Sequence, residues 1–287
     1  MSSTRIELYT GDSKMPQPDR YSLTGRICKT GKSYFTVRLL ILLLLLCIFL
    51  AGELPGSGLP SPTFASGLSS ATAAESPDSF QHKRRKMVAE QLKSRGIADQ
   101  SVLRAMDTVP RHLFVPASLR HRAYMDGPLP IGHGQTISQP FIVAYMTEMI
   151  RLQPQHQVLE IGTGSGYQAA VLAELTDRVY TMEIIPELAD SVGRRLKETG
   201  YTSVDVKQGD GYYGWPEAAP FDAIVVTAAA EFIPPPLLQQ LKEGGRMIIP
   251  VGSPFYVQYL MLVEKKQGKI TTRSLMPVRF VPFRRSQ

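Results

Sequence analysis

Short apolar runs alternate with longer amphipathic segments between residues 157 and 264, and this alternation predicts how the chain folds. Strands are expected at 157–161, 179–182, 204–208, 223–227, 246–250 and 257–264, and helices at 167–176, 186–199 and 234–242. Strands that alternate with helices form mostly parallel sheets with helices on both faces. The pattern therefore predicts an α/β fold with a doubly wound, mostly parallel sheet.

The last part of the chain has no helical segment between its apolar runs. Residues 258–264 and 270–281 are separated only by a short turn that contains Gln267 and Gly268. Two strands joined in this way pair antiparallel. Antiparallel strands are therefore expected at the C-terminal end of the sheet.

The segment that precedes the alternating region is expected to form a helical cap. Residues 83–95 have helical spacing, and Gly96 suits the end of that helix. Asp99 can cap a second helix, and helical spacing resumes at 141–152. Proline and glycine crowd residues 126–134, so a loop is expected there.

The N-terminal segments differ in composition from the rest of the chain. Residues 1–38 are polar and basic, 39–51 are apolar, and 52–80 are a linker rich in Gly, Pro, Ser and Ala. A signal sequence has this order of basic, apolar and small residues. The apolar run is shorter than the roughly 17 residues that a membrane-spanning helix needs. Residues 81–287 are then expected to form one catalytic domain.

A glycine-rich turn follows the strand expected at 157–161. Gly162, Gly164 and Gly166 lead directly into the next predicted helix. Glycine lets a ligand approach the backbone closely, and a helix N-terminus presents unpaired N–H groups. This turn is therefore a candidate ligand site.

The spacing of the glycines distinguishes between the candidate ligands of this turn. A dinucleotide fingerprint has glycines at its first, third and sixth positions, whereas Tyr167 takes the sixth position here. Glu160 precedes the turn, and Glu183 ends the next apolar run, where a carboxylate can accept both hydroxyls of a ribose. This variant resembles the first motif of S-adenosylmethionine-dependent methyltransferases. A turn without a ligand and a nicotinamide site are the alternatives.

Several further segments resemble the protein-L-isoaspartate O-methyltransferase family. The most specific is the Thr-Ile-Ser-Gln-Pro core of residues 129–140. The others are 110–116, Gly209-Asp210-Gly211 with Trp215, 220–229 and 278–282. The resemblance covers about residues 83–284. It implies a Rossmann-like methyltransferase domain with S-adenosyl-L-methionine as its cofactor.

The resemblance also implies roles for single residues. Ser138 is the family's active-site position, where its hydroxyl would donate to the substrate carboxylate; capping of the following helix is the alternative role. Glu160 would lie near the methionine amino group, Glu183 near the ribose, and Asp210 and Gly211 near the adenine. The full set of expected cofactor-binding residues is Gln135, Thr136, Ile137, Glu160, Gly162, Gly164, Gly166, Glu183, Asp210 and Gly211.

The implied reaction is methylation of the free α-carboxylate of an L-isoaspartyl residue. The methyl ester then cyclises to a succinimide, which reopens in part to normal aspartate. An α-carboxyl with a pKa of about 3.5 is already ionised at neutral pH, so the reaction needs alignment rather than a strong base. Both cysteines, Cys28 and Cys47, precede the predicted domain, and no histidines have metal-ligand spacing.

Isoaspartyl proteins and peptides are the implied partners, and a monomer is expected. The net charge of +7 could attract nucleic acid. Methyltransferases that act on base amines usually carry an Asn/Asp-Pro-Pro-aromatic motif where this chain has residues 227–230, so no nucleic-acid partner is expected. Another class I methyltransferase acting on nucleic acid, and a non-catalytic cofactor-binding relative, are the alternatives.

The location of the protein has two readings. Family resemblance implies the cytoplasm, and Met87 opens a segment that resembles the start of shorter relatives. The basic flank before residue 39 instead predicts an exported body, with residues 39–51 as a signal or a membrane anchor.

Overall fold

The computed structural model describes residues 77–253 and 255–286. The predictions for residues 1–38, for 39–51 and for most of 52–80 lie outside these ranges. The first described helix, α2 (Pro77–Met87), begins within the predicted linker. Among the described helices, none combines the length and the apolar composition needed to cross a bilayer.

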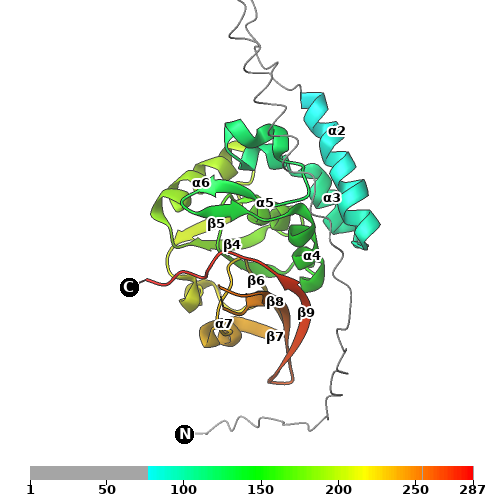
Figure 1. Ribbon diagram of the computed structural model, residues 1–287. Coiled ribbons are helices and arrows are strands. Elements are labelled where there is room, and N and C mark those ends of the chain that lie inside the picture. The colour runs from blue at the N-terminus through cyan, green and yellow to red at the C-terminus, as the bar shows by residue number, and fades with distance from the viewer. Residues whose placement is uncertain (1–76, 254, 287) are drawn as a thin grey trace, which may run out of the picture. The chain divides into compact units, whose positions relative to one another are not determined.

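The described region is built on a seven-stranded sheet with the spatial order β5-β4-β3-β6-β7-β8-β9 (Figure 1). The first five strands in this order, from β5 through β4, β3 and β6 to β7, are parallel to one another. Strand β8 pairs antiparallel with β7, and β9 pairs antiparallel with β8. The bounds are β3 Gln157–Ile161, β4 Arg178–Glu183, β5 Val204–Gln208, β6 Phe221–Val226, β7 Leu241–Val251, β8 Gln258–Lys266 and β9 Lys269–Val278. The predicted mostly parallel sheet and its antiparallel end are confirmed.

Side chains of β3 alternate between two hydrophobic clusters. Val158 packs in the cluster that contains buried residues of helices α4 (Pro140–Ile150) and α5 (Tyr167–Ala173). Leu159 packs in the cluster that contains Leu237 of α7 (Pro235–Gln240). Since successive strand residues point to opposite faces, helices cover both faces of the sheet, as predicted. Helix α6 (Pro186–Glu198) contributes Val192 and Leu196 to a third hydrophobic cluster, which also contains residues of α4 and α5.

The helical cap differs in detail from its prediction. Helix α2 continues as a π-helical turn, Val88–Leu92, and a 3-10 turn, Lys93–Arg95, instead of one uniform helix. It ends at Gly96, whose φ of 95° suits a residue without a Cβ. Asp99 caps α3 (Gln100–Thr108) by accepting hydrogen bonds from two backbone amides. Two 3-10 turns follow, at Arg111–Phe114 and Ala117–Arg122.

Part of the loop predicted at 126–134 is a strand. Strand β1 (Leu129–Gly132) pairs antiparallel with β2 (Gln135–Ile137). Leu129 and Ile137 are cross-strand partners, and each is 3% exposed. Burial of this pair outweighs the turn-forming composition of the segment, which local sequence rules could not anticipate. The hairpin leads directly to Ser138 and helix α4.

Candidate functional site

The glycine-rich turn joins β3 to α5, at the carboxyl end of the central strand. Gly162 has a φ of 97°, and a Cβ at this position would lie 2.5 Å from Oγ1 of Thr227. The Thr227 hydroxyl in turn contacts the carbonyls of Ile161 (2.9 Å) and Gly162 (2.7 Å). The close packing of β6 against the turn therefore requires glycine at position 162.

A cavity of about 740 Å³ lies over this turn. Nine of the predicted site residues line it: Gln135, Thr136, Ile137, Ser138, Glu160, Gly162, Gly164, Glu183 and Gly211. Segments that are far apart in the sequence therefore meet at one cavity, as the family resemblance implies.

Two predicted cofactor residues, Gly166 and Asp210, do not line this cavity. A Cβ on Gly166 would lie 2.5 Å from Cγ2 of Val192, so this glycine allows α6 to pack against the turn. The carboxylate of Asp210 accepts hydrogen bonds from Arg285 Nε (2.9 Å) and the backbone amide of Ser286 (3.0 Å). Burial acts to raise the pKa of Asp210, but these bonds lower it overall. Asp210 therefore holds the C-terminal segment.

Glu160 is fully buried on β3 and lines the cavity. Its Oε2 accepts a hydrogen bond from the Thr181 hydroxyl at 2.5 Å, whereas its Oε1 has no partner. Burial raises the pKa of Glu160 to about 8, although the Thr181 bond favours the charged form. A buried carboxylate oxygen without a donor suits a ligand that brings a cation, such as the ammonium of S-adenosylmethionine.

Glu183 is 4% exposed and ends β4. Its Oε2 accepts from the amide of Gly164 at 2.7 Å, and its Oε1 accepts from the amide of Ile185 at 3.0 Å. The carboxylate thus connects the glycine turn to the end of β4. Each carboxylate oxygen can accept a further hydrogen bond, so Glu183 can still accept hydrogen bonds from both hydroxyls of a ribose.

Ser138 lies where the first cavity meets a second one, of about 1070 Å³. The two cavities share four lining residues, Thr136, Ser138, Thr227 and Val281. Gln139, rather than Ser138, is the residue before α4, and no side chain caps this helix. The alternative role of Ser138 as a helix cap is therefore wrong.

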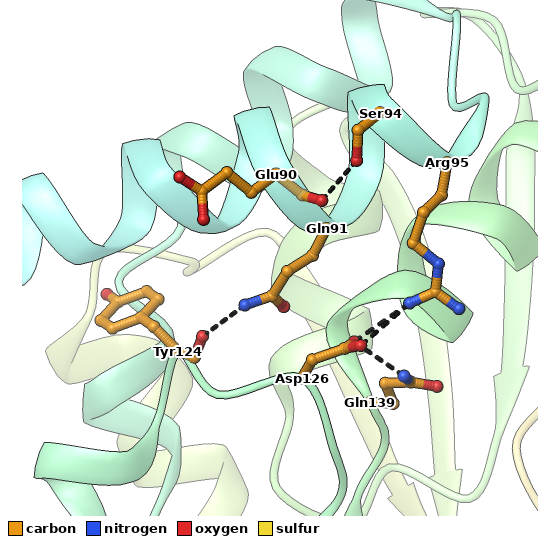
Figure 2. A network of polar contacts seen from close by, with 7 residues as sticks. All are labelled: Glu90, Gln91, Ser94, Arg95, Tyr124, Asp126 and Gln139. Atoms are coloured by element: carbon orange, nitrogen blue, oxygen red, sulfur yellow. Dashed lines mark hydrogen bonds and ion pairs between the residues drawn. The ribbon is translucent and has the colours of Figure 1, made fainter.

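The segment after Ser138 is held by the helical cap (Figure 2). Gln139 Nε2 donates to Asp126 Oδ1 at 2.7 Å, and Arg95 Nη1 lies 3.1 Å from both oxygens of Asp126. The Arg95 guanidinium also lies 3.9 Å from the centroid of the Phe141 ring. These contacts connect the start of α4 to the 3-10 turn Lys93–Arg95 of the cap.

Sequence reasoning missed two groups of residues at or beside the cavity. The first is a pair of hydroxyl groups, that of Thr163, which lines the cavity, and that of Thr181, which lies behind Glu160; the two oxygens are 2.7 Å apart. The register places Thr181 opposite Glu160, so a threonine inside an apolar run was the available signal. The second is the C-terminal segment at 281–284, which lines the cavity after pairing with Ala229; the sequence identified residues 278–282 as a match to the family but did not place them at the cofactor cavity. Only tertiary structure brings this segment there.

The residues that the structure describes include no cluster of histidine, cysteine and carboxylate side chains that could hold a metal ion. The polar groups at the cavity are instead carboxylates, hydroxyls and backbone amides. Such groups suit an organic ligand that carries hydroxyls and an ammonium group.

Comparison with known proteins identifies the family. A family model described as protein-L-isoaspartate(D-aspartate) O-methyltransferase matches residues 82–287. The protein-L-isoaspartate O-methyltransferase of Opitutus terrae is 63% identical over 206 residues, 72% of this chain and 88% of that relative. Protein-L-isoaspartate O-methyltransferase 1 of Nitrosospira multiformis is 60% identical over 208 residues, 71% of this chain and 88% of the relative.

A solved structure supports the cofactor. It is described as a protein-L-isoaspartate O-methyltransferase from Plasmodium falciparum in complex with S-adenosyl-L-homocysteine, and it matches with a TM-score of 0.62 and 28% identity. The match covers 70% of this chain and 98% of that chain. S-adenosyl-L-homocysteine is what remains of S-adenosyl-L-methionine after methyl transfer. The chain therefore belongs to the protein-L-isoaspartate(D-aspartate) O-methyltransferase family and is an S-adenosyl-L-methionine-dependent methyltransferase.

Proposed function

We propose that the two adjoining cavities bind the two reactants of isoaspartate repair, with Ser138 between them. The enzyme methylates the free α-carboxylate of L-isoaspartyl residues in damaged proteins and peptides, which is the activity of its family. The observation that supports the arrangement is that Ser138 lines both cavities. The methyl donor would occupy the cavity over the glycine turn, and the peptide would occupy the other.

The first cavity holds the groups that suit S-adenosyl-L-methionine, which supplies an activated methyl group when bound. Glu160 offers its unpartnered Oε1 to the ammonium of the methionine part. Glu183 receives the ribose hydroxyls, and Gly211 and the neighbouring cavity wall meet the adenine. Asp210 contributes by holding Arg285, which lies 3.6 Å from the centroid of the Tyr212 ring, rather than by lining the cavity.

The second cavity has a predominantly apolar wall that suits the residues of a peptide next to the isoaspartate. Among its lining residues are Phe141, Ile142, Val257, Met276, Val278 and Phe280. The Ser138 hydroxyl would donate to one oxygen of the isoaspartyl carboxylate and direct the other toward the methyl group. Since this carboxylate is already charged at neutral pH, positioning is the main contribution of the protein.

The test is methyl transfer by the full-length protein from labelled S-adenosyl-L-methionine to matched peptides. One peptide contains L-isoaspartate, and its twin contains aspartate at the same position. We expect label on the isoaspartyl peptide alone, and formation of succinimide after the ester forms. Label on both peptides, or on neither, would contradict the proposal.

We further propose a monomer that acts on polypeptides rather than on nucleic acid, and that works in the cytoplasm. Family resemblance supports the cytoplasm, whereas the composition of residues 1–80 favours the alternative of export or a membrane anchor at 39–51. Cell fractionation, together with mass spectrometry of the mature N-terminus, separates the two. A membrane-bound protein that retains residue 39 would contradict the cytoplasmic location.

A further inference from the structure

Arg111 is a completely buried cation, with a relative exposure of 0%. It begins the 3-10 turn Arg111–Phe114, in the segment that precedes the β1–β2 hairpin. No described carboxylate forms an ion pair with it, and its Nη1 is buried without a hydrogen-bond partner. Burial lowers its pKa to about 10, which still leaves the guanidinium charged at neutral pH. A buried charge without an opposite charge is costly, so its retention calls for an explanation.

The guanidinium of Arg111 contacts two residues that line the first cavity, Ser138 and Tyr167. Its Nη2 donates to the carbonyl of Ser138 at 2.7 Å, and its Nε donates to the carbonyl of Ala123 at 2.7 Å. Its Cζ lies 4.8 Å from the centroid of the Tyr167 ring. Ser138 and Tyr167 both line the cavity, Ser138 from the hairpin side and Tyr167 from the end of the glycine turn.

We propose that Arg111 is a positioning residue for methyl transfer: it orients Ser138 and places an uncompensated positive charge behind the binding site of the substrate carboxylate. The inference rests on the proposed role of Ser138 at the junction of the two cavities. The charged guanidinium is hydrogen-bonded directly to the backbone carbonyl of Ser138. In a buried environment, an unpaired cation attracts a nearby anion more strongly than it would in water.

The charge balance of the site supports this role. Glu160, the fully buried carboxyl group of the cavity, accepts a hydrogen bond from Thr181, lines the cofactor cavity and forms no ion pair with Arg111; burial raises its pKa to about 8. Arg111 therefore has no resident anion, and the isoaspartyl carboxylate is the anion that the reaction brings. Arg111 does not touch the reacting atoms; it acts through Ser138 and Tyr167.

A purely structural role is the competing explanation. Two backbone carbonyls and an aromatic ring could suffice to stabilise a buried arginine, which would then only fasten residues 111–124 to the hairpin. Such a residue would affect the free energy of unfolding and would not distinguish a charged substrate from a neutral one. The two roles therefore differ in a measurable property.

The experiment compares Arg111→Met and Arg111→Lys with the full-length wild type. Arg246→Met is the control for the loss of an arginine elsewhere in the fold: Arg246 is partly buried and donates to the backbone carbonyl of Met149 at 3.1 Å, but unlike Arg111 it forms an ion pair, with Glu264. Thermal unfolding, S-adenosyl-L-methionine affinity by calorimetry, and kcat and KM for an isoaspartyl peptide are measured. The inhibition constant of the same peptide with its isoaspartyl α-carboxylate converted to a carboxamide is measured as well.

We expect Arg111→Met to lower kcat/KM by about tenfold or more, while cofactor affinity changes by less than about threefold. The preference of the wild type for the carboxylate peptide over the carboxamide should shrink by a similar factor. Arg111→Lys, which keeps the charge, should restore much of that preference. Arg246→Met should lower the melting temperature without changing the preference.

The inference fails if Arg111→Met lowers only the melting temperature, or if cofactor affinity falls in parallel with kcat/KM. It also fails if the preference for the carboxylate is unchanged in Arg111→Met. If Arg111→Met does not fold, Arg111→Lys decides the question. Loss of the preference for the carboxylate peptide in Arg111→Lys, which retains the positive charge, would overturn the electrostatic role of Arg111. An inactive wild type would instead contradict the proposed function itself, so the two failures are distinguishable.

Discussion

Thr181 donates a hydrogen bond of 2.5 Å to the buried carboxylate of Glu160, and the other oxygen of that carboxylate has no partner. The two residues face each other across the paired strands β3 and β4. Burial raises the pKa of Glu160 to about 8 from an ordinary value of 4.5. The free protein therefore holds a proton on Glu160 at neutral pH, and this proton has consequences for stability and for binding.

The stability of the free protein should fall as the pH rises from about 5 to about 8. In this window the folded state binds more protons at Glu160 than the unfolded state, so the free energy of unfolding decreases with pH. Glu160→Gln mimics the neutral form and should flatten that decrease. Melting temperatures across this range test the prediction, with the exposed Glu231→Gln as a control. A decrease that persists unchanged in Glu160→Gln would assign it to other groups.

Cofactor binding should release a proton from Glu160 at neutral pH. The ammonium of S-adenosyl-L-methionine favours the charged carboxylate, so the pKa of Glu160 should fall when the cofactor binds. Calorimetry at pH 7 in buffers of different ionisation enthalpy should detect close to one released proton. In Glu160→Gln this release should disappear, and affinity should weaken by about tenfold to a hundredfold. Equal release by both proteins would remove Glu160 from the cofactor site.

Glu183→Ala should impair both folding and cofactor binding. The carboxylate accepts from the amides of Gly164 and Ile185, and each buried amide left unpaired costs about 1–3 kcal/mol. Glu183→Gln retains one acceptor oxygen and should lose less stability. Denaturant unfolding and calorimetry measure the two effects separately. Cofactor affinity equal to that of the wild type in a folded Glu183→Ala protein would exclude its ribose role.

Ser138→Ala should lower turnover more than cofactor affinity. A lost hydrogen bond to a charged carboxylate corresponds to a decrease of about tenfold to a hundredfold in kcat/KM. The helix should remain intact, because Ser138 does not cap α4. Steady-state kinetics and calorimetry on the same preparation give the comparison. A parallel loss of cofactor binding would make the serine a part of the cofactor wall.

Gly162→Ala should destabilise the fold by about 1–3 kcal/mol. The new Cβ would lie 2.5 Å from Oγ1 of Thr227, and the φ of 97° is unfavourable for any residue with a Cβ. Thr227→Ala in the same protein removes the clash but not the backbone strain, so it should restore only part of the stability. Chemical denaturation of the wild type, of Gly162→Ala and of the double variant measures this. Full recovery in the double variant would mean that the backbone strain is negligible.

The local pattern of apolar and polar residues was enough to predict most strands of the sheet. The segments predicted as strands at 157–161 and 204–208 became β3 and β5 with the same bounds. Strand β3 is central and mostly buried, whereas β5 is an edge strand in which apolar and polar residues alternate. Asp99 was recognisable as a cap because its carboxylate needs only the adjacent amides. The family and its cofactor were also recognisable in the sequence, since the motifs at 129–140 and 162–166 are contiguous.

Tertiary packing decided those contacts that join residues far apart in the sequence, which no contiguous motif can specify. Strand β1 exists because Leu129 and Ile137 are buried together, against the turn-forming composition of their segment. Asp210 contacts Arg285, 75 positions away, instead of lining the cavity. The position of Arg111 behind Ser138 depends on long-range folding in the same way. The amino-acid sequence alone determined the strands, the turn and the family, because these depend on neighbouring residues; the charges and contacts around the cavity depend on residues that only folding brings together.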